Sequence, residues 1–265
     1  MDRGRFPASA EAGADRRSLS AGADGWTLRY DNRGGDWMAY GYRARDRYLS
    51  VSASLPWEIC AGPIAGVVCG VLLGLEGRTL LHGAALKLGH SAFALIGASG
   101  HGKSTLAAAL VREGAALLTE DLLVSAPSPG GWIVEPGGPS LHLLEDSYAA
   151  LGEPSGAAAP KVRDGKFAID VPAAGAGQEP LAAIYVLDPP GADTEARFNR
   201  LTRARALMRV LDHLYGAPWI RPRSEGDLRF CSDLVAQVPV YALSRPWRLD
   251  RVAETAAMLR RHSAP

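Results

Sequence analysis

Residues 97–105 read GASGHGKST and directly follow the apolar run AFALI at 92–96. The next stretch, STLAAALVRE at 104–113, consists of strong helix formers, and Gly114 can end that helix. An apolar strand, a glycine-rich loop and a helix therefore stand in the order that a phosphate-binding loop requires. This order predicts an α/β fold built around the loop.

The residue types in this loop suit the binding of a nucleoside triphosphate. Gly97, Gly102, Lys103 and Ser104 satisfy the pattern G-x-x-x-x-G-K-[ST]. Glycines let backbone N–H groups turn toward phosphate oxygens, and the N-terminus of the following helix adds partial positive charge. Lys103 can hold the β- and γ-phosphates, and the Ser104 hydroxyl can bind Mg²⁺. We expect ATP and Mg²⁺ to bind here, with these nucleotide-binding residues: Gly97, Ala98, Ser99, Gly100, His101, Gly102, Lys103, Ser104 and Thr105.

Acidic residues and one histidine flank the loop in the sequence. Asp121 follows Lys103 by 18 residues, within the strand-like run AALLTEDLLVSAP, and can bind the metal or take a proton. Glu120 points to the other face if that strand is regular. His82 ends the short apolar run TLLH, where a histidine is more often structural than functional. Glu135 ends the short strand GWIVEP, before a proline-glycine turn.

Strand-like and helix-like segments alternate along the rest of the chain. We expect a flexible leader at residues 1–20 and a single domain at 21–265, whose β-rich N-terminal part spans about 21–60. Two apolar runs separated by Gly89 and His90 predict a hairpin that leads into the loop. In the helical stretch 201–216, the expected buried face consists of Leu201, Ala204, Leu207, Met208 and Leu211.

The composition and net charge of the chain indicate what class of protein it is. The chain has 265 residues, 47% hydrophobic and 22% charged, which is typical of a globular protein, and its net charge of +1 provides no field that favours nucleic acid. Three scattered cysteines suggest reduced thiols in a cytoplasmic protein. The segment 59–75 (ICAGPIAGVVCGVLLGL) is uncharged, but it is shorter than the about 20 residues of a membrane span and contains Pro63. We expect a buried helix here and no membrane association; this apolar face could also be an interface in a homo-oligomer.

Taken in order, the motifs resemble the HPr kinase/phosphorylase family and its shorter serine-kinase relatives. The matching segments are LLHGAAL, IGASGHGKSTLAAALVREGAALLTEDLL, VEPGGPSLHL, PLAAIYVL and VPVYALSRP. His82 precedes Lys103 by 21 residues, and the acid pair ends the strand after the loop helix, as in that family. The resemblance implies a P-loop kinase core of the HPr kinase C-terminal-domain type, with a mixed sheet and flanking helices.

The resemblance also implies roles for individual residues. Lys103, Asp121 and His82 take catalytic positions: Asp121 as the proton acceptor for a serine hydroxyl, and His82 beside the transferred phosphate. Ser104, Glu120 and Glu135 are the implied metal-binding residues. The family has an arginine in a mobile loop, for which Arg163 or Lys166 in VRDGKFAID could serve.

The resemblance implies an ATP-dependent serine kinase, and the shorter relatives indicate which class of acceptor to expect. The segment VEPGGPSLHLLEDS resembles those relatives more than the full-length enzymes. Some of them resemble kinases that phosphorylate the C-terminal serine of lasso precursor peptides, so we expect a peptide or protein acceptor of this kind. Two alternatives stay open: a kinase for an HPr-like protein or a small molecule, and a nucleotide-gated regulatory or scaffold module without phosphate transfer.

Overall fold

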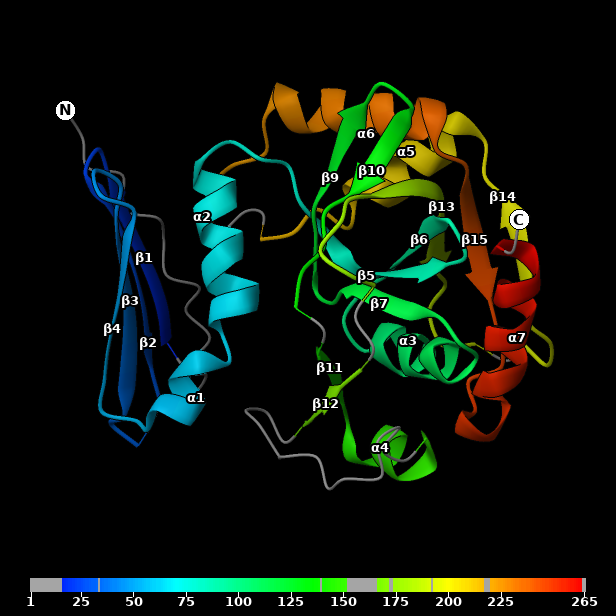
Figure 1. The fold of residues 1–265 in the computed structure, drawn as a ribbon, viewed down its shortest axis with the longest axis horizontal. Helices are drawn as coiled ribbons and strands as arrows, with labels where there is room; N and C mark the ends of the chain where they lie inside the picture. Colours follow the sequence, from blue (N-terminus) through cyan, green and yellow to red (C-terminus); the bar gives the residue numbers. More distant parts are fainter. Residues whose placement is uncertain are drawn as a thin grey trace.

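The computed structural model describes residues 16–32, 34–138, 140–151, 166–171, 174–191, 193–216 and 220–263. Two β-sheets of different size dominate the fold, with a helical segment between them (Figure 1). The larger sheet carries the glycine-rich loop, and the smaller one is formed by the N-terminal part of the chain.

In the described residues, the larger sheet has nine strands and is mixed. Its main path follows the order β14-β15-β13-β6-β5-β7, and β8, β9 and β10 pair at its margins. The strands are β5 (Leu81–Leu88), β6 (Ser91–Ile96), β7 (Ala116–Thr119), β8 (Leu122–Leu123), β9 (Ser125–Ser128), β10 (Gly131–Val134), β13 (Glu179–Leu187), β14 (Arg197–Arg200) and β15 (Val240–Ser244). The three central strands β6, β13 and β15 are parallel, whereas β5, β7 and β14 run antiparallel to their neighbours.

The expected hairpin before the loop is confirmed. β5 and β6 pair antiparallel with Leu88 opposite Ser91, and Gly89 in the connecting turn has φ 60°. Glycine adopts this left-handed conformation without the steric cost that a side chain would add. Because β5 is antiparallel to β6, the beginning of β5 lies beside the end of β6, where the loop starts.

Helices cover both faces of the larger sheet, so the domain has three layers. One apolar core lies between the sheet and the helices α3 and α7, and a second lies between the opposite face and the helices α5 and α6. The elements involved are α3 (Lys103–Arg112), α4 (Glu145–Leu151), α5 (Arg203–Leu211), α6 (Glu225–Gln237) and α7 (Val252–Ser263), with the small sheet β11 (Ser140–Leu143) and β12 (Phe167–Asp170) beside α4. The fold is thus a mixed α/β fold with flanking helices, as predicted.

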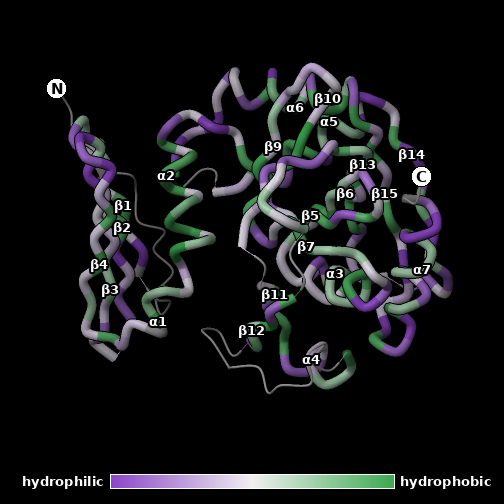
Figure 2. The backbone as a smooth tube through the Cα atoms, in the orientation of Figure 1, coloured by the Kyte–Doolittle hydropathy of each residue, from purple (hydrophilic) through white to green (hydrophobic). Residues whose placement is uncertain are grey.

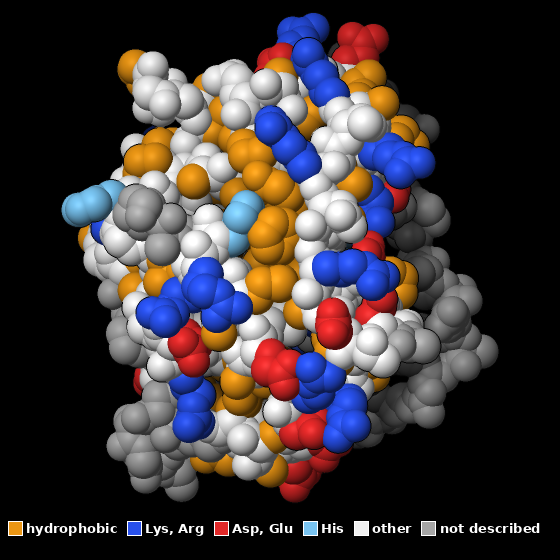
Figure 3. Space-filling view, turned by 90° about the vertical axis from the view of Figure 1, so that its right-hand side faces the viewer, with side chains coloured by type: hydrophobic (Ala, Val, Ile, Leu, Met, Phe, Trp, Pro, Cys, Tyr) orange, Lys and Arg blue, Asp and Glu red, His pale blue; other side chains and the backbone are white. Residues whose placement is uncertain are grey.

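The outer side of this domain, which carries α7 and β14, is chemically mixed. Hydrophobic side chains form a broken band down this side, and Lys and Arg side chains lie along it (Figure 3). Ion pairs such as that between Arg251, just before α7, and Glu254 in the first turn of α7 neutralise part of that charge.

The buried face of α5 differs from the one predicted. Ala206 and Val210 are the residues that pack into the core, while Met208 is 61% exposed. The predicted stripe and the observed one share Leu201, Leu207 and Leu211, which are partly buried against the same core, whereas Ala204 is exposed. The small side chain of Ala206 lets the helix approach the sheet closely, and the periodicity of large apolar residues does not reveal this.

The smaller sheet is an antiparallel meander, β1-β2-β3-β4. Its strands are β1 (Arg16–Gly22), β2 (Gly25–Asp31), β3 (Trp37–Arg43) and β4 (Tyr48–Ala53). Large aromatic residues on one face, including the fully buried Tyr40, form its core. Strand β1 begins at Arg16, within the segment assigned above to the leader; residues 1–15 lie outside the described part.

The apolar segment 59–75 folds into a broken helix that packs against this sheet. It comprises α1 (Trp57–Ala61), a π-helical segment (Ile64–Val68) and α2 (Cys69–Leu75). Val68 and Val71 join the core of the smaller sheet, and α2 lies between the two sheets (Figure 1). Hydrophobic residues follow one another along α2 in Figure 2. Within the described ranges, no helix combines the length and apolar character needed to cross a bilayer.

Helix α2 contacts the larger domain through small residues. Tyr215 packs where a side chain at Gly70 would lie: a Cβ there would come within 2.4 Å of Tyr215 Cε1. We expect Gly70→Ala to lower the free energy of unfolding by about 1–3 kcal/mol, because the methyl group must displace the ring. Chemical denaturation measures this. Gly66→Ala on the same helical segment is the matched control, since no atom lies within 4 Å of its Cβ position; equal stability of the two variants would contradict the close packing.

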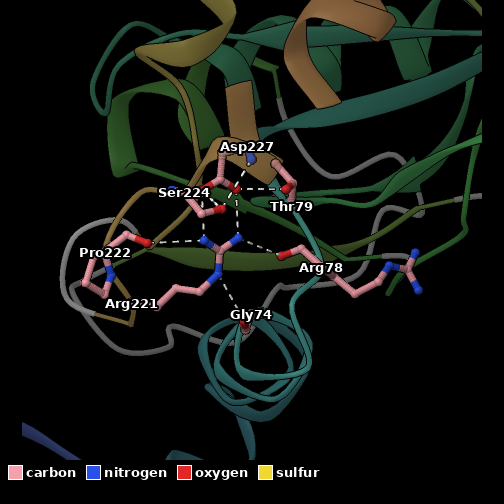
Figure 4. A network of polar contacts seen from close by, with 7 residues as sticks. All are labelled: Gly74, Arg78, Thr79, Arg221, Pro222, Ser224 and Asp227. Atoms are coloured by element: carbon pink, nitrogen blue, oxygen red, sulfur yellow. Dashed lines mark hydrogen bonds and ion pairs between the residues drawn. The ribbon is translucent and has the colours of Figure 1, made fainter. Parts of the chain in front are cut away.

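A partly buried ion pair between Arg221 and Asp227 connects α2 to α6 (Figure 4). Arg221 donates to both carboxylate oxygens of Asp227, at 2.7 and 2.8 Å, and its Nε donates to Gly74 O at 3.1 Å. Thr79 Oγ1 donates to Asp227 at 2.8 Å, and Asp227 forms a capping box with Ser224 at the start of α6. Burial opposes ionisation of Asp227, but the hydrogen bonds from Arg221, Thr79 and Ser224 outweigh it and hold the pKa of this carboxyl below its usual range.

Candidate active site

The glycine-rich loop connects β6 to α3, so the predicted order of strand, loop and helix is observed. Gly100 and Gly102 have φ of 81° and 73°, which explains the need for glycine at these positions. Ala98, Ser99 and Gly100 are exposed at the tip of the loop. Thr105 in the first turn of α3 shares a hydrogen bond of 2.9 Å with Ser147 of α4.

Lys103 is the first residue of α3 and its side chain folds back under the loop. It is only 7% exposed, and its Nζ donates to Gly97 O at 2.9 Å and Ala98 O at 3.2 Å. Its third partner is His82 Nε2 at 3.0 Å. Burial lowers the pKa of Lys103, although the nearby carboxylates of Asp121 and Glu120 oppose this shift. The three donors of the ammonium group are thus matched by three acceptors.

The contacts of His82 define its tautomer. Its Nδ1 lies 3.2 Å from the carbonyl oxygen of Asp121, which can only accept, so Nδ1 carries the proton. Nε2 then accepts from the Lys103 ammonium. Burial and the positive charge of Lys103 lower the pKa of His82, which favours this neutral form. The structure therefore brings His82 and Lys103 into direct contact.

The acid pair interrupts the strand that was predicted to run through it. β7 ends at Thr119 and β8 begins at Leu122, and Asp121 between them has φ 62°. Leu122 N donates to Glu120 O at 2.7 Å, which closes this tight turn, and Gly83 N donates to Asp121 O at 3.2 Å. Aspartate is one of the few residues that tolerate the left-handed region. The turn places Asp121 next to the beginning of β5.

Glu120 faces a partner that the sequence did not suggest, His142 in β11. Glu120 Oε2 accepts from the backbone N–H of His142 at 2.9 Å and lies 2.8 Å from its Nδ1. The hydrogen bond with Glu120 raises the pKa of His142. The other carboxylate oxygen, Oε1, is buried and has no hydrogen-bond partner. Leaving a buried acceptor unsatisfied is costly, so this oxygen is available to a donor or a cation.

The remaining predicted residues lie in different settings. Glu135 forms an ion pair of 2.6 Å with Arg78, outside the group around Lys103. Lys166 lies close enough that its positive charge adds to the lowering of the pKa of His82 and Lys103 and opposes the rise in the pKa of His142. Arg163, the other predicted basic residue, lies outside the described residues.

Beside the loop is a cavity of about 530 Å³ whose walls come from both halves of the molecule. Its lining residues are Arg17, Val67, His82, Gly97, Ala98, Ser99, Asp212, His213, Leu214, Tyr215 and Gly216. Burial, reinforced by Arg209, lowers the pKa of His213 to about 4, so the His213 imidazole is neutral at pH 7. Burial also raises the pKa of Tyr215. Sequence reasoning missed Arg17, His213 and Tyr215, since no motif marks them.

The residues around Lys103 offer oxygen ligands of the kind that Mg²⁺ prefers. The unpartnered Glu120 Oε1, the Asp121 carboxylate and the Ser104 hydroxyl fit such an ion. In the ranges that the structure describes, no three His, Cys, Asp or Glu residues group closely enough to hold a metal by themselves. Mg²⁺ is usually held by one or two carboxylates together with substrate phosphates, so the donor set here fits a nucleotide-dependent site.

Comparison with known proteins gives limited information. No protein-family model and no curated protein matches the chain. Among solved structures, the chain is similar to the HPr(Ser) kinase/phosphatase from Coxiella burnetii, with a TM-score of 0.36 and 12% sequence identity. That match covers 69% of this chain and 95% of the other.

Proposed function

We propose that this protein is an ATP-dependent kinase that transfers the γ-phosphate to a serine hydroxyl of a peptide or protein. The observation that carries the proposal is the contact of the loop lysine with His82, next to Asp121 and at the mouth of a cavity. A loop that only binds nucleotide needs neither a histidine at its lysine nor an acid beside it.

The residues divide the chemical work between them. The loop amides and Lys103 would neutralise charge on the phosphates, with a phosphate oxygen replacing one of the three acceptors that Lys103 now contacts. Exchange of the contact with His82 Nε2 would leave the neutral imidazole beside the transferred group. Mg²⁺, when bound at Glu120 and Ser104, would supply further positive charge at the phosphates.

Asp121 is the proposed general base. Its carboxylate would accept the proton of the serine hydroxyl, the serine oxygen would form the new bond to phosphorus, and the bond to the ADP oxygen would break. The tight turn holds the backbone of Asp121 against the beginning of β5, next to His82, which supports this role. Positioning matters more than basicity here, because the transition state of phosphate transfer is loose.

The cavity is the proposed acceptor site. Its volume of about 530 Å³ lies within the range of small-ligand pockets and suits the end of a peptide or a short loop. Within this class, the C-terminal serine of a lasso precursor peptide is the specific acceptor that we propose, on the basis of the sequence resemblance to the shorter serine kinases.

The test is incubation of the full chain with Mg-ATP and a set of acceptors, followed by mass spectrometry of each acceptor. The set contains a peptide that ends in serine, the same peptide with the serine replaced by alanine, one with the serine at an internal position, and an HPr-type protein. Phosphate on the first peptide alone supports the specific proposal, and phosphate on another serine supports the general one. If ATP binds but no serine gains phosphate, the protein is a nucleotide-gated module.

A further inference from the structure

The ends of three parallel strands form an edge beside the phosphate loop. β6, β13 and β15 run in the same direction, so their carboxyl ends meet at one side of the sheet. The loop follows β6, Asp188 follows β13, and Arg245 follows β15. In open α/β sheets, ligands bind in the crevice outside the carboxyl ends of the strands.

The proposed phosphate transfer indicates on which side of the loop the nucleoside lies. The attacking and leaving oxygens lie roughly in line across the transferred phosphorus. His82, Asp121 and the acceptor cavity lie on the β5 side of the loop. The nucleoside must then extend from the loop toward the opposite side, across the ends of β13 and β15.

An aromatic side chain stands on that opposite side. Trp247 is 46% exposed, and it packs on the loop so closely that a Cβ at Gly102 would lie 3.5 Å from its ring. The Arg245 guanidinium lies over the ring at 5.2 Å from the centroid. A cation thus lies over the indole, and nearly half of the Trp247 side chain is accessible to a ligand.

Arg245 fixes this arrangement to the loop itself. It is 8% exposed and donates to the carbonyl oxygen of His101. Asp188, at the end of β13, accepts from Arg209 at 2.9 Å and from Ser244 at 2.8 Å, so its carboxylate is already paired. At this edge the acid, Asp188, is already paired, and the group available to a ligand is the ring of Trp247, which Arg245 holds next to the loop.

We propose that the base of the bound nucleotide stacks on the exposed face of Trp247, with Arg245 as the positioning residue that holds the indole against the loop. This inference rests on the proposed function, because it assumes that the loop binds a nucleoside triphosphate. Stacking uses the face of the base and no hydrogen-bond pattern, so ATP and GTP should gain similar affinity from it.

The experiment compares the binding of Mg-ATP, Mg-GTP and inorganic tripolyphosphate by isothermal titration calorimetry. Loss of one base stack by alanine substitution costs about 10- to 100-fold in affinity. We expect Trp247→Ala to weaken ATP and GTP by this factor and to leave tripolyphosphate unchanged, which also shows that the loop is intact. Trp247→Phe retains an aromatic face and should stay within about threefold of the wild type. Trp57→Ala is the matched control, because Trp57 is 60% exposed on α1, beside the smaller sheet.

The outcomes separate this inference from the function on which it rests. If the wild type binds ATP more tightly than tripolyphosphate and Trp247→Ala does not remove that difference, the stacking site is wrong while the phosphate loop stands. Equal weakening of ATP and tripolyphosphate in Trp247→Ala would also overturn it, since Trp247 would then act on the loop. If the wild type binds neither ligand, the proposed function and the inference fail together.

Discussion

Replacement of Asp121 by asparagine is expected to lower kcat for phosphate transfer by about 10²- to 10⁴-fold, the usual contribution of a general base. Asparagine preserves the shape of the side chain and tolerates the left-handed φ of 62° at this position. The turn between β7 and β8 should therefore persist, with its hydrogen bonds to His82 and Gly83. Single-turnover transfer to a serine peptide measures the effect on the chemical step.

Measurements of ATP binding and a control variant show whether the lower kcat of Asp121→Asn reflects loss of the base or of the metal. If Asp121 acts as the base, Mg-ATP should bind to the variant almost as it does to the wild type. A loss confined to Mg²⁺-dependent ATP binding would instead assign Asp121 to the metal. Asp146→Asn, at an exposed acid in the first turn of α4, is the matched control and should transfer phosphate normally. Transfer at the wild-type rate by Asp121→Asn would refute the assignment of the base.

The second large effect concerns stability. We expect Arg221→Met to lower the free energy of unfolding by about 3–5 kcal/mol, because it leaves the carboxylate of Asp227 buried without its cation. The Asp227 side chain is 5% exposed, and its other partners, Thr79 and Ser224, carry no charge. Urea denaturation at pH 7 gives the value.

A second variant distinguishes an unpaired charge from a simple loss of contacts. Arg221→Met combined with Asp227→Asn should recover a large part of the stability, because no buried charge remains. Arg248→Met is the matched surface control: its ion pair with Asp250 is 68% and 62% exposed, so its removal should cost less than about 1 kcal/mol. A double variant no more stable than Arg221→Met would show that the charge is not the cause.

The sequence predicted those features that depend on neighbouring residues. The strand, the loop and α3 follow one another within a short stretch, and the hairpin before them is marked by Gly89. The break at the acid pair was not predicted, because apolar residues on both sides of Glu120 suggested one continuous strand. Only the tertiary contact of Gly83 with Asp121 O and the left-handed conformation of Asp121 reveal the turn.

Residues that reach the site from distant elements could not be predicted. The partner of Glu120, His142, lies in β11, and its approach depends on how that small sheet packs beside α3. Arg17 enters the cavity from β1 of the other sheet, and His213 enters from the end of α5. None of these residues belongs to a spaced motif, so their role depends on tertiary packing.

The antiparallel direction of β5 affects how two parts of the proposed site, the residues around the loop and the opposite wall of the cavity, can change in evolution. Because β5 starts beside the loop, His82, the loop and Asp121 all belong to the continuous stretch 81–123. The groups proposed to handle the phosphate donor can therefore be inherited as one contiguous unit. The opposite wall of the cavity comes from β1 and from residues 212–216, which are far away in the sequence. Substitutions in those separate segments would change the proposed acceptor site while the proposed phosphate-handling unit stays as it is.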